Sequence, residues 1–301
     1  MEREVRDCFS YIGSILGLLL SAFLISSCSE PDSLHDKLKG DWVSKYYHDG
    51  WSEKRLVFSF EDSSCLNSIP YGEKAKYALL NDTFIICEKR GYEKRIKESS
   101  FKILKLNSDT LVISSIADSI GKLDNYKIFT KSNKVRLKKL KKRNNFKFKN
   151  LAFFRGLCYY DCTAFYLEID KYGNFIFNGI QNTLYDGFHS GKIQLSDYNN
   201  ILQKVNQLNL DSLEERYYAH WGHDQTCGVK IQFEDNSIES KAYGYYKEPI
   251  ELRILFYYLM NLYHDVELTK NPSVEKKLFF REFYEDAFPR LFPPKSPPPN
   301  H

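Results

Sequence analysis

The chain has 301 residues, 16% of them aromatic, and a formal net charge of +4 at pH 7. This length is enough for two modest domains. So mild a positive charge argues against a dedicated nucleic-acid-binding protein. Apart from the abundance of aromatic side chains, the composition is that of an ordinary globular protein.

The first thirty residues have the pattern of a secretion signal. Residues 11–25, YIGSILGLLLSAFLI, form an uncharged apolar run. A membrane-spanning helix needs about 20 residues, so this shorter run is more typical of a signal-peptide core. An ordinary membrane anchor is the alternative.

The apolar run ends in residues 24–28, LISSC, which resemble the lipobox of bacterial lipoproteins. The resemblance implies cleavage before Cys28, attachment of diacylglycerol to its thiol, and loss of residues 1–27 as a signal peptide. Ser29 stands where retention signals place aspartate, which implies sorting to the outer membrane. The expected location is therefore the cell envelope, with a lipid anchor at Cys28 and no nucleic acid among the partners.

Residues 28–130 are predicted to form an all-β domain. Short apolar runs alternate with turn-forming pieces, and the clearest hairpins carry Asn81-Asp82 and residues 107–109 at their turns, where Asn and Asp tolerate the required backbone angles. Successive hairpins without helices favour an up-and-down antiparallel barrel or a rolled sheet. The expected strands are 41–47, 56–60, 76–80, 83–87, 95–106, 110–116 and 125–130.

Gly40 and Trp42, in LKGDWVS, resemble the opening of lipocalin-like domains, in which the tryptophan closes one end of the barrel. Two interpretations stay open at this point. The barrel either holds a small apolar ligand, or it is filled by its own side chains with Trp42 as a plug.

Residues 131–147 are predicted to be a basic linker that contains the domain boundary. Lysine and arginine crowd this stretch, and no acidic residue occurs between Lys127 and Asp161. A charge run of this kind is usually a solvated connector. An electrostatic contact with anionic lipid or glycan near the anchor is the alternative.

Residues 148–268 are predicted to form an α+β domain, in which two helices cover one face of an antiparallel sheet. A helix is expected after Ser196 because Tyr198, Ile201, Leu202, Val205 and Leu208 recur at helical spacing. A second helix is expected at 249–265. The expected strands are 151–155, 163–170, 174–178, 228–233 and 237–243.

This half resembles an uncharacterised domain family of bacterial lipoproteins, whose members carry C-x-G-x-C-P-x-Y before a hairpin that ends in glycine. Cys158 and Cys162 hold the cysteine positions, and Gly173 and Gly179 the hairpin glycines. Tyr160, Thr163 and Phe165 replace the motif's glycine, proline and tyrosine, while Tyr217 and Asp224 match a later loop. The resemblance implies no known activity.

Residues 269–301 are expected to be a loosely held, Pro-rich tail. Its first part could form an amphipathic turn or two. Its end, PPKSPPPNH, has the pattern of polyproline with little to bury.

One loop, YYAHWGHDQTC, contains candidate metal ligands. His220, His223 and Asp224 are residue types that zinc accepts, and Cys227 is close by. Without a helix the two histidines need not point together, so exposed or hydrogen-bonded side chains are the favoured interpretation and no metal or other cofactor is expected. The sequence also lacks a Gly-x-Ser-x-Gly elbow, a phosphate-binding glycine loop and a His-Glu-x-x-His motif.

Five cysteines remain in the mature chain once Cys28 is lipidated and residues 1–27 are lost. In an oxidising envelope they tend to pair. The spacing of Cys158 and Cys162 allows a disulfide. A thioredoxin-type pair has two intervening residues at a helix start, and zinc would need further ligands from the 220–227 loop. We therefore expect a structural Cys158–Cys162 disulfide, with a Cys158–Cys227 bridge as an alternative.

These features together favour a non-catalytic, lipid-anchored envelope protein that binds a partner or a small apolar ligand. The partner would be an envelope protein or a glycan. The alternative is a metal-dependent hydrolase that uses the His220, His223 and Asp224 loop.

Overall fold

The computed structural model describes residues 33–48, 53–67, 74–89, 96–116, 134–158, 162–219, 225–244, 247–289 and 291. The expected signal peptide, Cys28 and the expected strand at 125–130 lie outside these ranges. Within the described ranges, none of the helices has the length and apolar character needed to cross a membrane.

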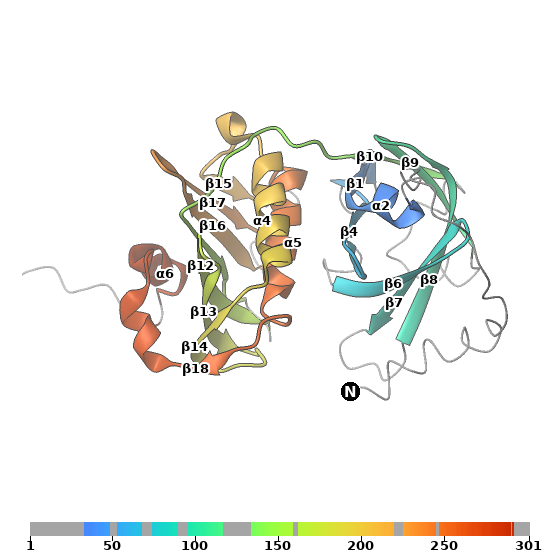
Figure 1. The fold of residues 1–301 in the computed structure, drawn as a ribbon. Coiled ribbons are helices and arrows are strands. Elements are labelled where there is room, and N and C mark those ends of the chain that lie inside the picture. Colours follow the sequence, from blue (N-terminus) through green and yellow to red (C-terminus); the bar gives the residue numbers. More distant parts are fainter. Residues whose placement is uncertain are drawn as a thin grey trace, which may run out of the picture. The chain divides into compact units, whose positions relative to one another are not determined.

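The N-terminal half is a closed antiparallel barrel of eight strands (Figure 1). A short helix, α2 (Leu34–Leu38), leads into the first strand. Around the barrel the order is β1-β10-β9-β8-β7-β6-β5-β4, and a separate ribbon pairs β2 (Tyr47–His48) with β3 (Glu53–Lys54). The barrel strands are β1 (Gly40–Ser44), β4 (Val57–Phe60), β5 (Ser64–Asn67), β6 (Lys74–Leu80), β7 (Thr83–Lys89), β8 (Ile96–Leu106), β9 (Thr110–Ser115) and β10 (Val135–Lys139).

The interior of the barrel is filled by its own side chains. Phe58 makes edge contacts with Phe84 and Phe101, whose rings stack on each other with centroids 5.0 Å apart. Trp42 is fully buried, and its indole Nε1 donates a hydrogen bond to the carbonyl of Leu38 at 2.6 Å. Of the two interpretations of the barrel, the packing matches the filled interior with Trp42 as a plug.

The last strand of the barrel comes from the basic run. Val135 and Leu137 are buried among the barrel's apolar side chains, while Arg136 and Lys138 between them are exposed. Residues 135–139 therefore form a strand where the sequence predicted a solvated linker over 131–147. The alternation of apolar and basic residues explains the difference, because a two-residue period suits a strand with one face on a core.

The C-terminal half is an eight-stranded sheet in the order β15-β17-β16-β11-β12-β13-β14-β18. Its neighbours are antiparallel except β15 and β17, which run parallel. The predicted fold class, a β-barrel followed by an α+β half, is confirmed. The strands are β11 (Asn150–Arg155), β12 (Ala164–Asp170), β13 (Asn174–Gln181), β14 (Gly187–Lys192), β15 (Arg216–Tyr218), β16 (Thr226–Gln232), β17 (Ser237–Tyr243) and β18 (Thr269–Lys270).

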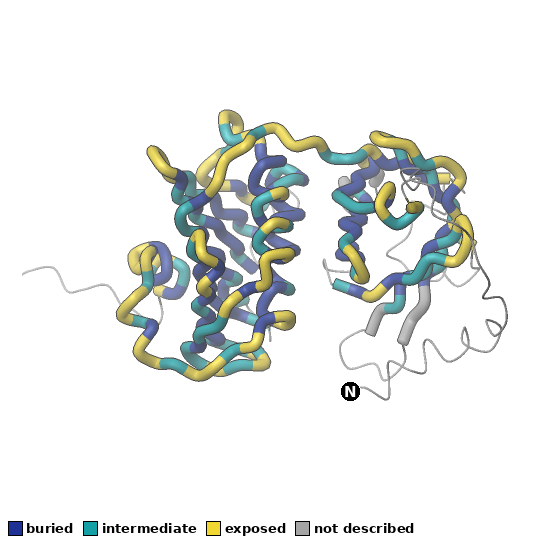
Figure 2. Tube along the Cα trace, viewed as in Figure 1, coloured by how far each residue is buried: buried dark blue, intermediate teal, exposed yellow. Residues whose placement is uncertain are grey.

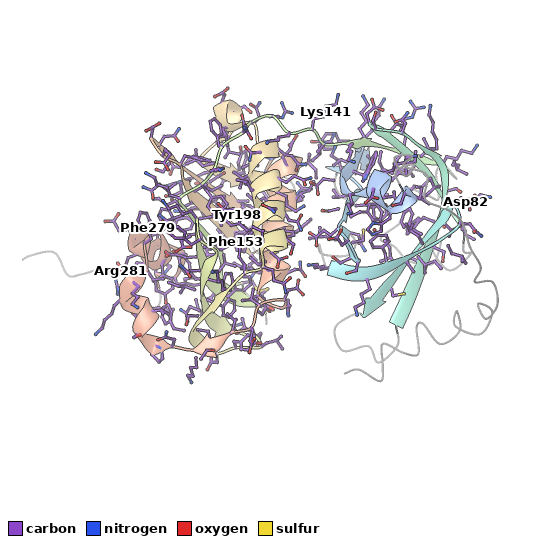
Figure 3. The ribbon with its side chains drawn as sticks, in the orientation of Figure 1. Asp82, Lys141, Phe153, Tyr198, Phe279 and Arg281 are labelled. Atoms are coloured by element: carbon purple, nitrogen blue, oxygen red, sulfur yellow. A yellow bond between two sulfur atoms is a disulfide. The ribbon has the colours of Figure 1, made fainter. Side chains whose placement is uncertain are left out.

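Two helices, α4 (Leu195–Gln207) and α5 (Ile250–Leu262), cover one face of this sheet (Figures 1 and 2). Ile201 and Val205 of α4 are buried in the core, as the helical spacing predicted. Phe153 of the sheet belongs to the same core, and Tyr198 of α4 packs against it (Figure 3). The helices therefore close one side of the domain.

The opposite face of the sheet is covered by a C-terminal segment that includes α6 (Arg281–Ala287). Phe283 and Tyr284 are buried against Phe154 and Tyr166. The backbone N–H groups of residues 279 and 280 both donate to the carboxylate of Glu168, each at 2.8 Å. The first part of the expected tail is thus packed and hydrogen-bonded. Its aromatic residues pack against an apolar face of the sheet. The sequence alone did not show that this face was left uncovered by the two helices.

From Leu34 onward the described residues form one compact unit, and buried contacts join the barrel to α4 and α5. Nζ of Lys204 in α4 lies 2.9 Å from a carboxylate oxygen of Asp41 in β1, and both side chains are almost fully buried. Val43 and Val57 of the barrel pack against Ile250 and Ile254 of α5. This second contact explains why α5 is apolar nearly all round.

Candidate functional site

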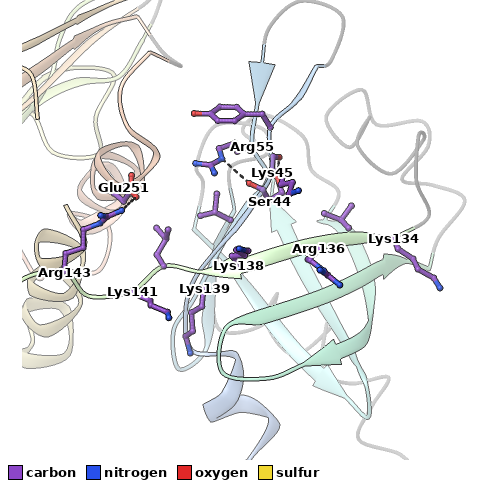
Figure 4. A pocket seen from close by; sticks show the side chains of 14 residues that line it. Ser44, Lys45, Arg55, Lys134, Arg136, Lys138, Lys139, Lys141, Arg143 and Glu251 are labelled. Carbon is purple, nitrogen blue, oxygen red and sulfur yellow. Dashed lines mark hydrogen bonds and ion pairs between the residues drawn. The ribbon is translucent and has the colours of Figure 1, made fainter. Parts of the chain in front are cut away.

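A groove of about 700 Å³ lies beside the barrel, where β1 and β10 run next to each other (Figure 4). Val43 of β1 is paired with Lys138 of β10, and Ser44 with Leu137. The apolar residues Val43, Val135 and Leu140 contribute to its lining. The remaining lining comes from the end of β1 and the residues after it, from Arg55, from Lys134, from β10 and the residues after it, and from Glu251 of α5.

The side chains that line the groove are strongly cationic. They include eight basic residues and a single carboxylate, that of Glu251, so the lining carries a formal charge of +7. The whole chain carries +4, which leaves −3 for all other residues together. The positive charge of the protein is therefore concentrated here. The basic residues are Lys45, Arg55, Lys134, Arg136, Lys138, Lys139, Lys141 and Arg143.

Few carboxylates neutralise these cations. Arg143 lies 3.6 Å from Glu251, as the dashed line in Figure 4 marks. Four others, Lys45, Arg136, Lys138 and Lys141, form no ion pair with any of the residues that the structure describes. Like charges held close together raise the local potential and attract anions.

Aromatic rings hold two of the cations in place. The Arg55 guanidinium lies 4.5 Å from the ring centre of Tyr46 and its Nε donates to the carbonyl of Ser44 at 3.1 Å. Lys139 Nζ lies 5.1 Å from the ring centre of Trp42. Burial lowers the pKa of Lys139, and the charge of Asp41 opposes that effect. Cation–π contacts of this kind orient a charge over the face of a ring.

A second hollow in the C-terminal half lacks this charge imbalance. It is lined by Lys230 together with Glu215 and Glu239. The Lys230 ammonium pairs with Glu239 at 2.7 Å. The charges of this hollow largely compensate each other, so it offers no comparable attraction for an ion.

The sequence-predicted metal ligands cannot be placed. His220, His223 and Asp224 lie outside the described residues, and so does Cys28. Within the described ranges there is no group of three or more His, Cys, Asp and Glu side chains able to hold a metal ion. The zinc interpretation of the 220–227 loop stays an untested prediction.

Cys158 and Cys162 are joined by a disulfide, with their Cα atoms 5.8 Å apart. The pairing is the one expected from their spacing. Cys227 lies buried in β16, opposite Arg155, and is not part of this bridge. The disulfide therefore links a residue just after β11 to one just before β12.

The hairpin glycines have structural roles in the C-terminal half. Gly173 has φ +79° in the turn between β12 and β13, a conformation that favours glycine. A Cβ atom on Gly179 would lie 1.8 Å from the carbonyl oxygen of Tyr185. Tyr217 uses its hydroxyl to accept a hydrogen bond from the backbone N–H of Glu214 at 2.7 Å. The contacts of these residues give them structural roles in the fold.

Comparison with known families finds a match to a domain of unknown function (DUF6438) over residues 149–263. Residues 149–263 are a DUF6438 domain. The matched stretch begins at β11 and ends just after α5, so it contains the two helices and most of the sheet. No curated protein matches the chain. The barrel, the C-terminal α6 segment and nearly all of the groove lie outside the DUF6438 domain.

Sequence reasoning did not find the groove. It treated the basic run as a solvated connector, although it kept a contact with anionic lipid or glycan as the alternative. The overlooked signal is the order VRLKK at 135–139, in which apolar and basic residues alternate before three further cations. That order predicts a strand whose inner face is apolar and whose outer face is cationic.

Proposed function

We propose that the protein is a non-catalytic, lipid-anchored component of the cell envelope that binds an anionic partner in the groove beside its barrel. The LISSC sequence before and including Cys28 supports the anchor and an outer-membrane location. The concentrated charge of the groove supports the binding role, because the lining carries a formal charge of +7 whereas all other residues together carry −3.

One observation carries this proposal: the barrel interior is occupied, whereas the groove is open. The packed rings of Phe58, Phe84 and Phe101 occupy the position where a lipocalin-like barrel would hold an apolar ligand. A groove of about 700 Å³ is of the size that accommodates a ligand or part of a larger molecule. A partner at the outer surface is therefore a better fit than a small apolar ligand inside.

Calorimetric titration with tripolyphosphate tests the anion site directly. The wild-type chain should bind it, and Arg136→Gln/Lys138→Gln should bind it about tenfold or more weakly because two cationic donors are replaced by neutral amides. A matched control, Lys76→Gln/Lys105→Gln, removes two exposed lysines of β6 and β8 that do not line the groove. Equal loss in both variants, or no binding by wild type, would refute the anion site.

The anchor is tested separately. Cys28→Ser should abolish incorporation of a labelled fatty acid and release the protein from the membrane fraction. Continued labelling together with continued fractionation into membranes would rule out the lipoprotein assignment. The labelling result does not depend on the groove, and washing the membranes at high salt removes any contribution of the groove to fractionation.

A further inference from the structure

We infer that the anion bound in the groove is the phosphate-bearing headgroup of an anionic phospholipid, in the membrane that holds the anchor. On this inference, which rests on the proposed function, the groove places one face of the barrel against the bilayer surface. The lipid at Cys28 alone would leave the body free to rotate on its tether. A second contact at the groove would define its orientation.

The lining of the groove suits the boundary of a bilayer, where charge and apolar surface meet. Arg136 and Lys138 are exposed on β10 (Figure 4), and among the apolar lining residues Leu140 is partly exposed, whereas Val43 and Val135 are buried. At its edge Tyr46 is 63% exposed although it carries a large ring. Exposed tyrosine beside lysine and arginine is the combination that settles at lipid headgroups, with the ring at the interface and the cations on phosphate.

The sequence connects the groove closely to the anchor. Six residue steps separate Cys28 from Leu34, a length that spans at most about 20 Å. The chain then passes through the five residues of α2 into β1, whose final residues line the groove. A short tether raises the effective concentration of headgroups around the groove, so that weak individual contacts are sufficient.

The four cations without an ion pair among the described residues give the contact its strength. Each basic residue close to an anionic surface strengthens binding by roughly fivefold. This attraction falls within a Debye length, so it is sensitive to salt. A zwitterionic surface lacks the negative potential on which it depends. The inference therefore requires binding that depends both on anionic lipid and on ionic strength.

Vesicle sedimentation provides the test, with the full chain carrying Cys28→Ser so that no attached lipid contributes. One set of vesicles contains phosphatidylcholine alone and the other contains phosphatidylcholine and phosphatidylglycerol in equal parts. The protein should sediment with the anionic vesicles in preference to the neutral ones, and added salt should release it. Any apolar contact by residues 11–25 is common to both sets, so only the difference between them counts.

Charge reversal then locates the contact. Arg136→Glu/Lys138→Glu should weaken binding to anionic vesicles by at least about tenfold, which follows from roughly fivefold for each cation lost. The control, Lys76→Glu/Lys105→Glu, makes the same change in net charge on β6 and β8 and should weaken binding less than about threefold. Both pairs are exposed on strands, and circular dichroism melting verifies that both variants remain folded.

Each outcome decides the inference. A preference for anionic vesicles that the groove variant loses and the control retains supports it. Equal binding to both vesicle types, or equal loss in both variants, overturns it. If tripolyphosphate binds and anionic vesicles do not, the groove is an anion site for a soluble ligand or a glycan: the proposed function stands and the lipid assignment fails. If neither binds, both fail.

Discussion

At the scale of single residues, the ion pair of Asp41 and Lys204 is the clearest link between the two halves of the protein. Lys204 Nζ lies 2.9 Å from Oδ1 of Asp41, and it also donates a hydrogen bond to the hydroxyl of Ser59 at 2.9 Å. The Lys204 ammonium lies 5.0 Å from the ring centre of Tyr258 in α5. One lysine of α4 thus pairs with an acid of the barrel and contacts the other helix.

Lys204→Ala should destabilise the protein by about 3–5 kcal/mol, because it leaves the buried Asp41 without its cation. The double variant Lys204→Met/Asp41→Asn should recover part of the loss, since it removes both charges together. The measurement is the free energy of unfolding in urea. A single variant as stable as wild type would show that the pair contributes nothing, contrary to its burial.

The same pair predicts a pH dependence. Burial by itself would raise the pKa of Asp41, but attraction to Lys204 and hydrogen bonding outweigh it and hold the pKa below its usual value. A depressed pKa stabilises the fold above the unfolded value, about 3.9, and this stability is lost as pH falls through the folded pKa. The gap in unfolding free energy between wild type and Asp41→Asn should therefore be widest above about pH 5 and shrink in acid. A gap independent of pH would contradict this.

At the scale of elements, α6 depends on the aromatic residues that cover the sheet. Phe283 is 2% exposed and contacts Phe154 of β11, whereas its near neighbour Phe279 is 54% exposed. Phe283→Ala should remove about 3 kcal/mol or more of packing and allow trypsin to cut faster at Arg281. Phe279→Ala is the matched control and should leave the cleavage rate nearly unchanged. Equal rates in both variants would mean that α6 is not held by its aromatic face.

Hydrogen bonds to Glu168 hold the C-terminal segment that includes α6, in addition to its apolar contacts. The Glu168 carboxylate accepts hydrogen bonds from two backbone N–H groups and from the hydroxyl of Tyr166. Burial raises its pKa even though these bonds oppose the shift. The C-terminal segment thus satisfies a buried acid of the sheet, and the acid in turn satisfies the start of α6.

Elements with a strong local pattern were predictable from the sequence. The hairpin at Asn81 was found from its turn residues, and Asn81 does have φ +54°. The helix α4 was found from its apolar spacing, and α5 was expected at 249–265 because Pro249 suits a first helical turn. The strands that were missed are short or lack an apolar run: β15 has three residues, and β14 reads GFHSGK. Such strands are defined by their neighbours in the sheet, which local sequence does not encode.

The groove was harder to predict than the strands because it belongs to no single segment. Its cations come from residues after β1, from Arg55 and from the basic run, and the pairing of β1 with β10 brings them together. The basic run alone suggested a connector. Residues 135–139 form a barrel strand because they pair with the edge of β9, and this pairing places Val135 and Leu137 in the buried interior. The sequence of the run does not show that such an edge exists.

At the scale of the whole molecule, the barrel ends later in the sequence than the composition suggested. β10 lies between β9 and β1, so it closes the barrel and supplies Leu137, which is fully buried. Beyond it, the backbone N–H groups of Arg143 and Asn144 donate to the carbonyl of Asn206 in α4. The stretch that connects the halves is therefore hydrogen-bonded at both ends, and the boundary between the barrel and the C-terminal sheet lies between Lys139 and Asn150.

A pair of fragments tests this boundary. Residues 29–145 contain all eight barrel strands, whereas residues 29–130 lack β10 and leave the edges of β1 and β9 unpaired. Both expose the valines that contact α5, so this loss is common to the two. The longer fragment should unfold in a cooperative thermal transition, and the shorter one should melt much lower or aggregate through its open edges. Leu137→Ala in the longer fragment should lower the free energy of unfolding by about 2–5 kcal/mol, because it leaves a cavity where a buried side chain of β10 had packed. If residues 29–130 unfold cooperatively with the same midpoint as residues 29–145, β10 is not needed for the barrel. The groove residues of β10 would then not be held in place by the barrel.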